Sequence, residues 1–196
     1  MIKPGTIIFL NGTSSSGKST LLRALQVQLS EAYLEAGIDK FIFMLPPRYL
    51  NTPLWDEVLG RASESGEMGH RLFSGMHYSI AALARAGNNV LADHVLVEPA
   101  WVRECAEVFA ELPAYLIGVR CPLDVMNARE AARGDRTLGQ AAKQFHKVHA
   151  HGVYDLEVDT STLSVDECVQ QIASHIESHA PSAFKQLLKE WEELTP

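Results

Sequence analysis

Residues 7–20 read Ile7-Ile8-Phe9-Leu10-Asn11-Gly12-Thr13-Ser14-Ser15-Ser16-Gly17-Lys18-Ser19-Thr20. The apolar run predicts a buried strand, and the stretch after it fits the pattern G-x-x-x-x-G-K-[ST] of a phosphate-binding loop (P-loop) that leads into a helix. Backbone N–H groups and the positive end of a helix then converge on one point, which suits a polyphosphate. We therefore expect a nucleotide to bind at Gly12 to Thr20, with Lys18 at the β- and γ-phosphates and the Ser19 hydroxyl on Mg²⁺. The alternative is a serine- and glycine-rich turn without a ligand.

Short apolar runs alternate along the chain with longer stretches of helical period, which is the pattern of a parallel sheet with crossover helices. The predicted strands span residues 6–11, 38–43, 89–93, 114–119 and 155–159. The predicted helices span residues 18–34, 68–86, 98–110, 122–132, 137–150 and 164–179. We therefore expect an α/β fold with a doubly wound, parallel, five-stranded sheet. Prolines and glycines interrupt residues 44–67, which we interpret as a candidate substrate loop.

The composition limits the partners of this chain. Its 17 Lys and Arg residues against 24 Asp and Glu residues give a formal charge of −7, the wrong sign for a protein that coats nucleic acid or an acidic membrane. The first apolar run is too short for a signal peptide, and no run approaches the ~18 apolar residues of a membrane span. Cys105, Cys121 and Cys168 form neither a CxxC pair nor a disulfide framework. We expect a cytoplasmic protein with no nucleic-acid or membrane partner.

The predicted strand at residues 89–93 ends in an acid, Asp93. A P-loop enzyme places at this position the carboxylate that supports Mg²⁺, so Asp93 is a candidate metal residue together with Ser19. A turn or helix-capping role for Asp93 is an equal alternative. His94 follows, and we expect it to be a solvated loop histidine rather than a substrate contact.

Three arginines, Arg129, Arg133 and Arg136, lie after the fourth predicted strand at positions i, i+4 and i+7, so they share one face if the helix continues. Guanidinium groups bind phosphate oxygens and neutralise the charge on a transferring phosphoryl group. We expect Arg133 and Arg136 to bind the nucleotide from a lid, and Arg129 is left open. The alternative is a charged helix face on which Glu130 and Asp135 pair with the arginines.

Asp39 lies in the predicted strand 38–43, which we expect to be the neighbour of the P-loop strand. A carboxylate there would face the γ-phosphate and could accept the proton of an acceptor hydroxyl late in phosphoryl transfer. Asp39 and Lys18 are therefore the candidate catalytic residues. A surface Asp39 that pairs with Lys40 is an equally weighted alternative.

Three histidines, His146, His149 and His151, suggest a metal site only superficially, because no cysteine or carboxylate stands at a suitable spacing. We expect them to form a solvated helix face within the lid.

The last residues form a separate amphipathic helix. Phe184, Leu187, Leu188, Trp191 and Leu194 recur at helical spacing within residues 181–196. We expect this helix to follow a P-loop kinase domain of residues 1–180, whose lid spans about residues 129–150. Its apolar stripe is expected to pack on its own domain, and a homo-oligomer contact is the alternative.

The chain resembles the chloramphenicol phosphotransferase family of P-loop small-molecule kinases over most of residues 6–177. The matching segments are Leu10 to Ser19, Gly37-Ile38-Asp39, Ala84-Arg85-Ala86-Gly87 with Asp93, Gly118-Val119-Arg120-Cys121-Pro122, Arg129 to Arg136, Ala141-Ala142-Lys143-Gln144 and Val153 to Thr160. The runs around Cys121 and Arg133 are far more specific than the P-loop, which many families share.

The resemblance implies an ATP-dependent 3′-O-phosphotransferase with an adenylate-kinase-like fold and a small alcohol as acceptor. It implies that Asp39 is the catalytic base, that Lys18 and Ser19 hold the phosphates and Mg²⁺, and that Arg133 and Arg136 bind the nucleotide. Chloramphenicol is the leading acceptor, with antibiotic resistance as one role and metabolism as the other.

Two other functions remain open. The first is a P-loop kinase for another small metabolite, a nucleoside monophosphate or an activated sugar. The second, from a different class, is an ATP-binding switch that hydrolyses ATP slowly and signals through lid closure. A switch needs neither a catalytic base nor an acceptor pocket, so Asp39 and the irregular segment 44–67 favour a kinase.

Overall fold

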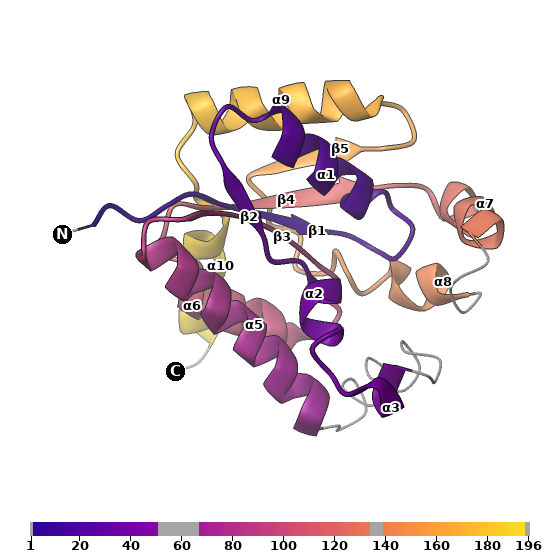
Figure 1. Ribbon diagram of the computed structural model, residues 1–196, viewed down its shortest axis with the longest axis horizontal. Coiled ribbons are helices and arrows are strands. Elements are labelled where there is room, and N and C mark those ends of the chain that lie inside the picture. Colours follow the sequence, from indigo (N-terminus) through magenta and orange to yellow (C-terminus); the bar gives the residue numbers. More distant parts are fainter. Residues whose placement is uncertain (1, 51–66, 134–138, 195–196) are drawn as a thin grey trace.

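Five parallel strands form one sheet in the order β2-β3-β1-β4-β5 in the computed structural model, which describes residues 2–50, 67–133 and 139–194 (Figure 1). The strands are β1 (Ile7–Asn11), β2 (Tyr33–Glu35), β3 (Asn89–His94), β4 (Ala114–Arg120) and β5 (Leu156–Asp159). β1 is buried along its whole length and pairs with β3 on one side and β4 on the other. The carboxyl ends of these three strands therefore meet at one edge of the sheet, and the expected five-stranded parallel fold is confirmed.

Helices cover both faces of the sheet (Figure 1). One face carries α1 (Lys18–Gln28) and α9 (Val165–Ser178), and the other carries α5 (Glu67–Arg85), α6 (Pro99–Phe109) and α10 (Ala183–Leu194). The remaining helices lie toward the carboxyl end of the sheet: α2 (Ile38–Ile42), α3 (Pro47–Leu50), α7 (Leu123–Arg133) and α8 (Gln140–Phe145). Two hydrophobic clusters, one on each face, fill the space between sheet and helices.

The helix after the P-loop follows from its sequence. Leu21, Leu22 and Leu25 recur at helical spacing, and all three are buried against the sheet. Burial of this stripe fixes the first turn of α1, and therefore Lys18, at the end of β1.

The second strand was predicted in the wrong place. Residues 38–42 form the helix α2, and the strand is Tyr33–Glu35, which the sequence placed at the end of the helix 18–34. Ile38 and Ile42 are both buried and lie one helical turn apart. In a short apolar run this spacing fits a strand as well as a helix, so the sequence pattern does not distinguish the two. β2 is an edge strand whose residues are exposed or half-buried, so it carries almost no apolar signal. It pairs with β3, and it does not neighbour the P-loop strand.

The predicted helix 137–150 is also too long. Helix α8 covers only Gln140–Phe145, and turns follow it to His151. The predicted helix 18–34 is too long as well, because α1 ends at Gln28. The remaining predicted strands and helices agree with the structure to within about two residues at the ends that it describes. Within residues 2–50, 67–133 and 139–194, no helix combines the length and the apolar character that a membrane crossing requires.

The C-terminal helix α10 packs on its own domain. Ala183, Phe184 and Leu187 are buried, and the Phe184 ring lies 5.2 Å from the ring of Phe109 and 6.0 Å from that of Phe9, measured between centroids. The first of the two expected roles of this helix is therefore confirmed, and a homo-oligomer contact through it stays a prediction.

Candidate functional site

The P-loop between β1 and α1 has the backbone conformation of an anion-binding loop. Ser15 has φ 61° and Gly17 has φ 94°, so two residues of the loop adopt the left-handed conformation that turns successive N–H groups toward one side. A Cβ atom on Gly12 would lie 2.6 Å from the carbonyl oxygen of Val119 in β4. The close approach of β4 therefore leaves no room for a side chain at position 12.

Lys18 lies at the start of α1 and is buried rather than exposed. Its Nζ atom donates a hydrogen bond of 2.6 Å to the carbonyl oxygen of Thr13, across the P-loop. The ammonium group is thus held over the loop where a phosphate would bind.

Two serine hydroxyls of the loop support an oxygen-rich ligand. Among the residues that the structure describes, the Oγ atoms of Ser15 and Ser16 are buried and make no hydrogen bond. Buried hydroxyls normally have partners, and an unsatisfied one costs free energy. Phosphate oxygens at the loop would satisfy them.

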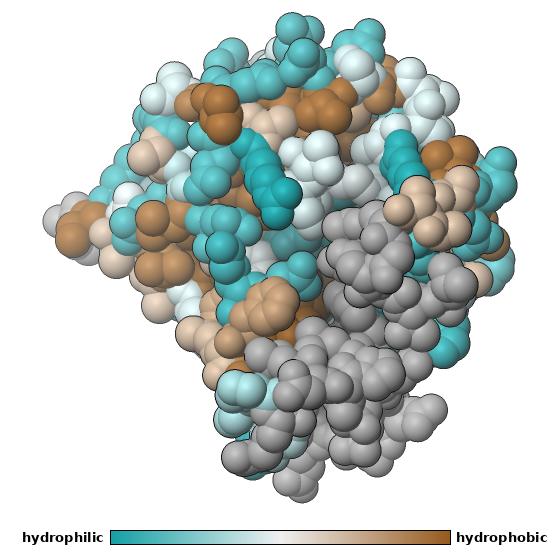
Figure 2. All heavy atoms as spheres, turned by 45° about the vertical axis from the view of Figure 1, so that its right-hand side comes forward, coloured by the Kyte–Doolittle hydropathy of each residue, from teal (hydrophilic) through white to brown (hydrophobic). Residues whose placement is uncertain are grey.

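A pocket opens above the P-loop and collects residues from three elements. Lys18 and Ser19 line it from α1, Asp39 from α2, and Asp93 from the end of β3. Ser14, Ser15, Gly17 and Thr20 also line it. Figure 2 views the molecule from this end and shows hydrophilic residues around a central hollow. The structure therefore brings together the predicted catalytic residues, the predicted metal residues and most of the P-loop.

Asp93 is buried beside the N-terminus of α2. Burial raises the pKa of its carboxyl, the Lys18 ammonium opposes that rise, the Asp39 charge adds to it, and a hydrogen bond with the backbone of Ile38 lowers it. Asp93 thus contacts the first turn of the helix that carries Asp39, although the N-cap residue of that helix is Gly37 and not Asp93. Its place in the pocket with Ser19 also keeps the metal role available.

Asp39 lies in the first turn of α2, half-buried, with Ile38 before it in the same pocket. Lys40 points elsewhere and pairs with Glu35 at 3.2 Å. The alternative, a surface Asp39 paired with Lys40, is therefore not supported.

His94 is fully buried, so the prediction of a solvated loop histidine is wrong. Its ring stacks on Phe9, its Nδ1 atom accepts a hydrogen bond of 2.8 Å from the Val95 N–H, and its Nε2 atom lies 3.3 Å from Nε2 of His77. His77 Nδ1 is in turn 2.6 Å from Glu104 Oε1. Burial holds the pKa of His94 well below its ordinary value, and His77 adds to the effect. Both ring nitrogens are engaged, so His94 supports the end of β3 and is not free to contact a substrate.

A second cavity of about 540 Å³ lies on the other side of the P-loop, within the size range of small-ligand sites. The P-loop, α7, α9 and the segment after β5 line it with Ser15, Gly17, Thr20, Leu21, Arg129, Ala132, Thr160, Leu163, Val165 and Cys168. Arg129 donates to the Thr160 carbonyl at 2.8 Å and to the Thr160 hydroxyl at 3.0 Å. That hydroxyl donates to the carbonyl oxygen of Ser16 at 2.7 Å, so Thr160 connects Arg129 to the P-loop.

The other two arginines cannot be placed with Arg129. Arg133 ends α7, and Arg136 lies outside the described residues. Glu130, which the sequence treated as an ion-pair partner, is buried and accepts hydrogen bonds from the N–H groups of Gly139 and Ala141 at 2.8 and 3.2 Å. Glu130 therefore caps α8.

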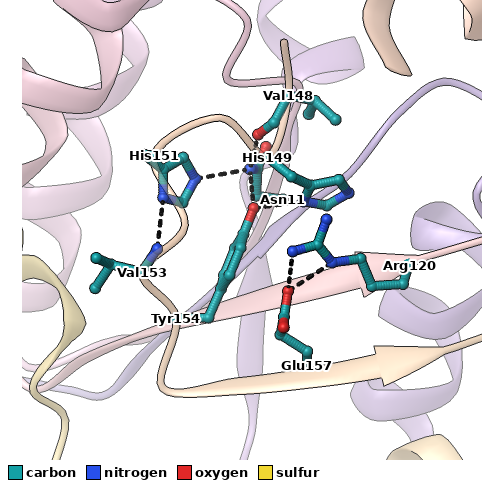
Figure 3. A network of polar contacts seen from close by, with 8 residues as sticks. All are labelled: Asn11, Arg120, Val148, His149, His151, Val153, Tyr154 and Glu157. Carbon is teal, nitrogen blue, oxygen red and sulfur yellow. Dashed lines mark hydrogen bonds and ion pairs between the residues drawn. The ribbon is translucent and has the colours of Figure 1, made fainter. Parts of the chain in front are cut away.

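Asn11, the last residue of β1, is a buried hub below the P-loop (Figure 3). Its Nδ2 atom donates to the carbonyl oxygen of Val148 at 2.8 Å and to the Tyr154 hydroxyl at 2.7 Å, and its Oδ1 atom accepts from the N–H of Leu96 at 2.9 Å. The loops after β3 and α8 are thus fastened to the residue that precedes Gly12.

Two of the three clustered histidines belong to this hub, so the predicted solvated helix face is wrong for them. His149 Nδ1 lies 2.6 Å from the Tyr154 hydroxyl, and His151 Nε2 lies 3.3 Å from Asn11 Nδ2 (Figure 3). Burial and then the Arg120 charge lower the pKa of His149 to about 3, and burial foremost lowers that of His151 to about 4. His146 alone is exposed. No group of three metal-ligating side chains occurs in the parts of the chain that the structure describes.

Sequence reasoning missed Asn11, Thr160 and Gln144 as parts of the site. Gln144 in α8 accepts a hydrogen bond of 2.8 Å from the N–H of Ser14. All three lie in segments that resemble a known family, but their types and spacing indicate no chemistry by themselves.

Comparisons with known proteins agree with this geometry. A family model described as chloramphenicol phosphotransferase-like protein matches residues 5–177. A Mycobacterium tuberculosis protein named "Putative O-phosphotransferase" is 32% identical over 199 residues, which cover 94% of this chain and 88% of that protein.

Solved structures share the fold at lower identity. The M. tuberculosis APS kinase CysC in complex with AMPPNP and APS has a TM-score of 0.61 at 17% identity, over 89% of this chain and 99% of that one. The Deinococcus radiodurans tunicamycin resistance protein has a TM-score of 0.62 at 15% identity, over 90% of this chain and 98% of that one.

Proposed function

The chain belongs to the family of chloramphenicol phosphotransferase-like proteins, and from that premise we propose that it transfers the γ-phosphoryl group of ATP to a hydroxyl of a small lipophilic acceptor. Chloramphenicol, phosphorylated at its 3′ oxygen, is the leading acceptor. The reaction is a cytoplasmic one in this proposal, which the three free, buried cysteines support.

One observation carries the proposal: Asp39 and Lys18 line the same pocket from two different elements. Lys18 sits where a P-loop lysine neutralises the β- and γ-phosphates. Asp39 comes from outside the P-loop, so an acceptor hydroxyl that lies between them can lose its proton to Asp39 as the phosphoryl group arrives. A switch does not need a catalytic base, so Asp39 in this pocket favours a kinase.

The surroundings of Asp39 support a lipophilic acceptor. Phe43 and Met44 follow α2 and are 65% and 73% exposed. Large apolar side chains at that exposure, four and five residues after Asp39, are typical of a surface that binds an apolar partner or ligand. Trp55 belongs to the candidate substrate loop 44–67 and lies outside the described residues.

The nucleotide is assigned to both cavities. Its phosphates take the P-loop pocket, and its nucleoside takes the 540 Å³ cavity next to Arg129, which continues from the P-loop through Ser15 and Gly17. The Ser19 hydroxyl and the Asp93 carboxylate would hold Mg²⁺, an ion that binds few protein ligands and keeps water and phosphate oxygens as the rest. Bound Mg²⁺ would neutralise charge on the phosphates during transfer. Arg133 and Arg136 bind the nucleotide from the lid in this proposal.

The test is acceptor-dependent turnover. The full chain with Mg·ATP is given a panel that contains chloramphenicol, other lipophilic alcohols, sugars and nucleoside monophosphates, and both ADP release and the mass of the acceptor are measured. The proposal expects a lipophilic alcohol to stimulate ADP release and to gain one phosphoryl group. Stimulation by a sugar or a nucleotide alone would assign another acceptor class. Slow ADP release that no acceptor changes would support the switch.

A further inference from the structure

The P-loop is held from outside by a side-chain amide. Gln144 is buried on α8, and its Oε1 atom accepts the hydrogen bond of 2.8 Å from the Ser14 N–H. Ser14 is a P-loop residue that also lines the pocket with Lys18, Asp39 and Asp93. A helix far along the chain thus supplies a polar group that holds a residue of this pocket.

The hydrogen bond fixes which way this amide faces. Because the donor is a backbone N–H, the acceptor must be the oxygen of Gln144, and its two Nε2 hydrogens remain for other acceptors. Among the described residues, the hydrogen bond from Ser14 is the one that the Gln144 side chain makes, and Nε2 is not one of the fully buried atoms that lack a partner. The donor group of Gln144 therefore stands beside Ser14 with its hydrogens available.

The P-loop carries further hydrogen-bond donors that a ligand could use. The buried hydroxyls of Ser15 and Ser16 in the same loop also have no partner within the described part of the chain. The Lys18 ammonium is bound to the carbonyl oxygen of Thr13, the residue before Ser14. Hydroxyl, amide and ammonium donors gathered at one loop fit a ligand that presents several anionic oxygens.

We propose that Gln144 contacts the terminal phosphoryl group of bound ATP: Oε1 holds the Ser14 N–H in place while Nε2 donates to an oxygen of the γ-phosphate. This inference rests on the proposed function. It makes α8 the element that distinguishes ATP from ADP, since only ATP presents the oxygen that Nε2 would bind.

The decisive variant is Gln144→Glu. A glutamate keeps the acceptor for the Ser14 N–H but replaces the amide donor by a second, negatively charged oxygen. A purely structural brace would survive this change, whereas a contact to the γ-phosphate would become repulsive. Gln144→Met, which loses both halves of the amide at similar volume, is the second variant.

The measurement is the dissociation constant of Mg·ADP and of the Mg complex of β,γ-imido-ATP, by calorimetry on the full chain. A hydrogen bond to a charged group corresponds to about a tenfold change in affinity or more. Gln144→Glu is expected to weaken β,γ-imido-ATP at least about tenfold more than ADP, and Gln144→Met is expected to lower the same preference. Gln140→Met is the matched control, because Gln140 is an equally buried glutamine one turn earlier on α8, at 7% exposed against 8% for Gln144.

The outcomes separate the inference from its premise. If the wild-type chain binds neither nucleotide, the proposed function fails and the role of Gln144 with it. If the wild-type chain binds β,γ-imido-ATP and Gln144→Glu weakens both nucleotides equally or neither, Gln144 is only a brace. Should Gln144→Glu fail to fold, Gln144→Met decides by the same comparison, and equal losses in Gln140→Met would also overturn the proposal.

Discussion

A Cβ atom on Gly37 would lie 2.0 Å from the Oδ1 atom of Asp93. Gly37 has an ordinary extended backbone, with φ −73° and ψ 164°, so its lack of a side chain serves space and not conformation. The space lets the Asp93 carboxylate reach the first turn of α2, where Asp39 lies. The distance between the two acids is therefore set by a glycine, and the closeness of Asp39 is one cause of the raised pKa of Asp93.

Gly37→Ala is expected to disturb the site more than the fold. The new methyl group must displace either Asp93 or α2, and overpacking of this kind typically costs about 1–3 kcal/mol. We expect phosphoryl transfer to fall sharply while the protein still melts cooperatively. Gly75→Ala is the control, because a Cβ at this helical glycine meets nothing within 4 Å and should leave activity unchanged. If Gly37→Ala and Gly75→Ala transfer phosphate at the same rate, the position of α2 relative to Asp93 does not matter for activity and the prediction is wrong.

Lys18→Met is expected to abolish transfer, with a loss of at least ~10²-fold, because the charge at the phosphates is removed. Methionine fills similar space, so the buried position should not leave a large cavity. The loss of the ammonium also removes the charge that lowers the pKa of Asp93, so that pKa should rise further. Initial rates at saturating ATP check the first effect, and wild-type turnover would end the P-loop assignment.

Stability is expected to fall in mild acid through His149 and His151. Their pKa values in the folded protein, about 3 and about 4, lie below the ordinary value of 6.5. The unfolded chain therefore binds protons first, so the stabilisation is complete above pH ~6.5 and declines as the pH falls toward the two folded values. One histidine contributes at most about 1.4 kcal/mol per pH unit, and less where it is half-exposed.

Thermal melts between pH 7 and pH 5 test this expectation. His149→Gln and His151→Gln should each flatten the dependence of the melting temperature on pH. The exposed His146 offers His146→Gln as the matched control, with the wild-type slope. A wild-type slope in all three variants would place the acid sensitivity elsewhere.

The site residues that could be predicted are those whose role follows from their neighbours in the sequence. The P-loop from Gly12 to Thr20 was readable because its pattern, its strand and its helix are contiguous. Asp93 was readable as an acid at a strand end. Asp39 was found for a partly wrong reason, since it lies on a helix and not on the strand beside β1.

The unpredictable part depends on contacts across the fold. Asn11 and Tyr154 are 143 residues apart, and Ser14 and Gln144 are 130 apart. A lone asparagine or glutamine has no sequence pattern that reveals such a partner. His94 shows the same limit, because a histidine after a strand is solvated or buried according to the helices that pack over it, here α5 with His77 and α6 with Glu104.

Phe184→Ala is expected to destabilise the domain while nucleotide binding remains. Phe184 is 2% exposed and packs edge-on against Phe9 and Phe109, and such truncations cost about 3–5 kcal/mol. Leu194→Ala, at a side chain 75% exposed on the same helix, should cost almost nothing. Urea unfolding measures both. Loss of ATP binding in folded Phe184→Ala would instead make α10 part of the site.

Asp39→Asn tests the proton acceptor. Asparagine keeps the size and most hydrogen bonding of Asp39 but cannot take a proton, so ATP affinity should change little while acceptor phosphorylation falls at least ~10²-fold. Lys40→Met is the matched control on the same turn: Lys40 pairs with Glu35, and its removal should leave transfer near the wild-type rate. ATP affinity by calorimetry and phosphorylation by acceptor mass separate binding from chemistry. If Asp39→Asn transfers at the wild-type rate, Asp39 is not the base, and Asp93, the other carboxylate in the pocket, becomes the next candidate.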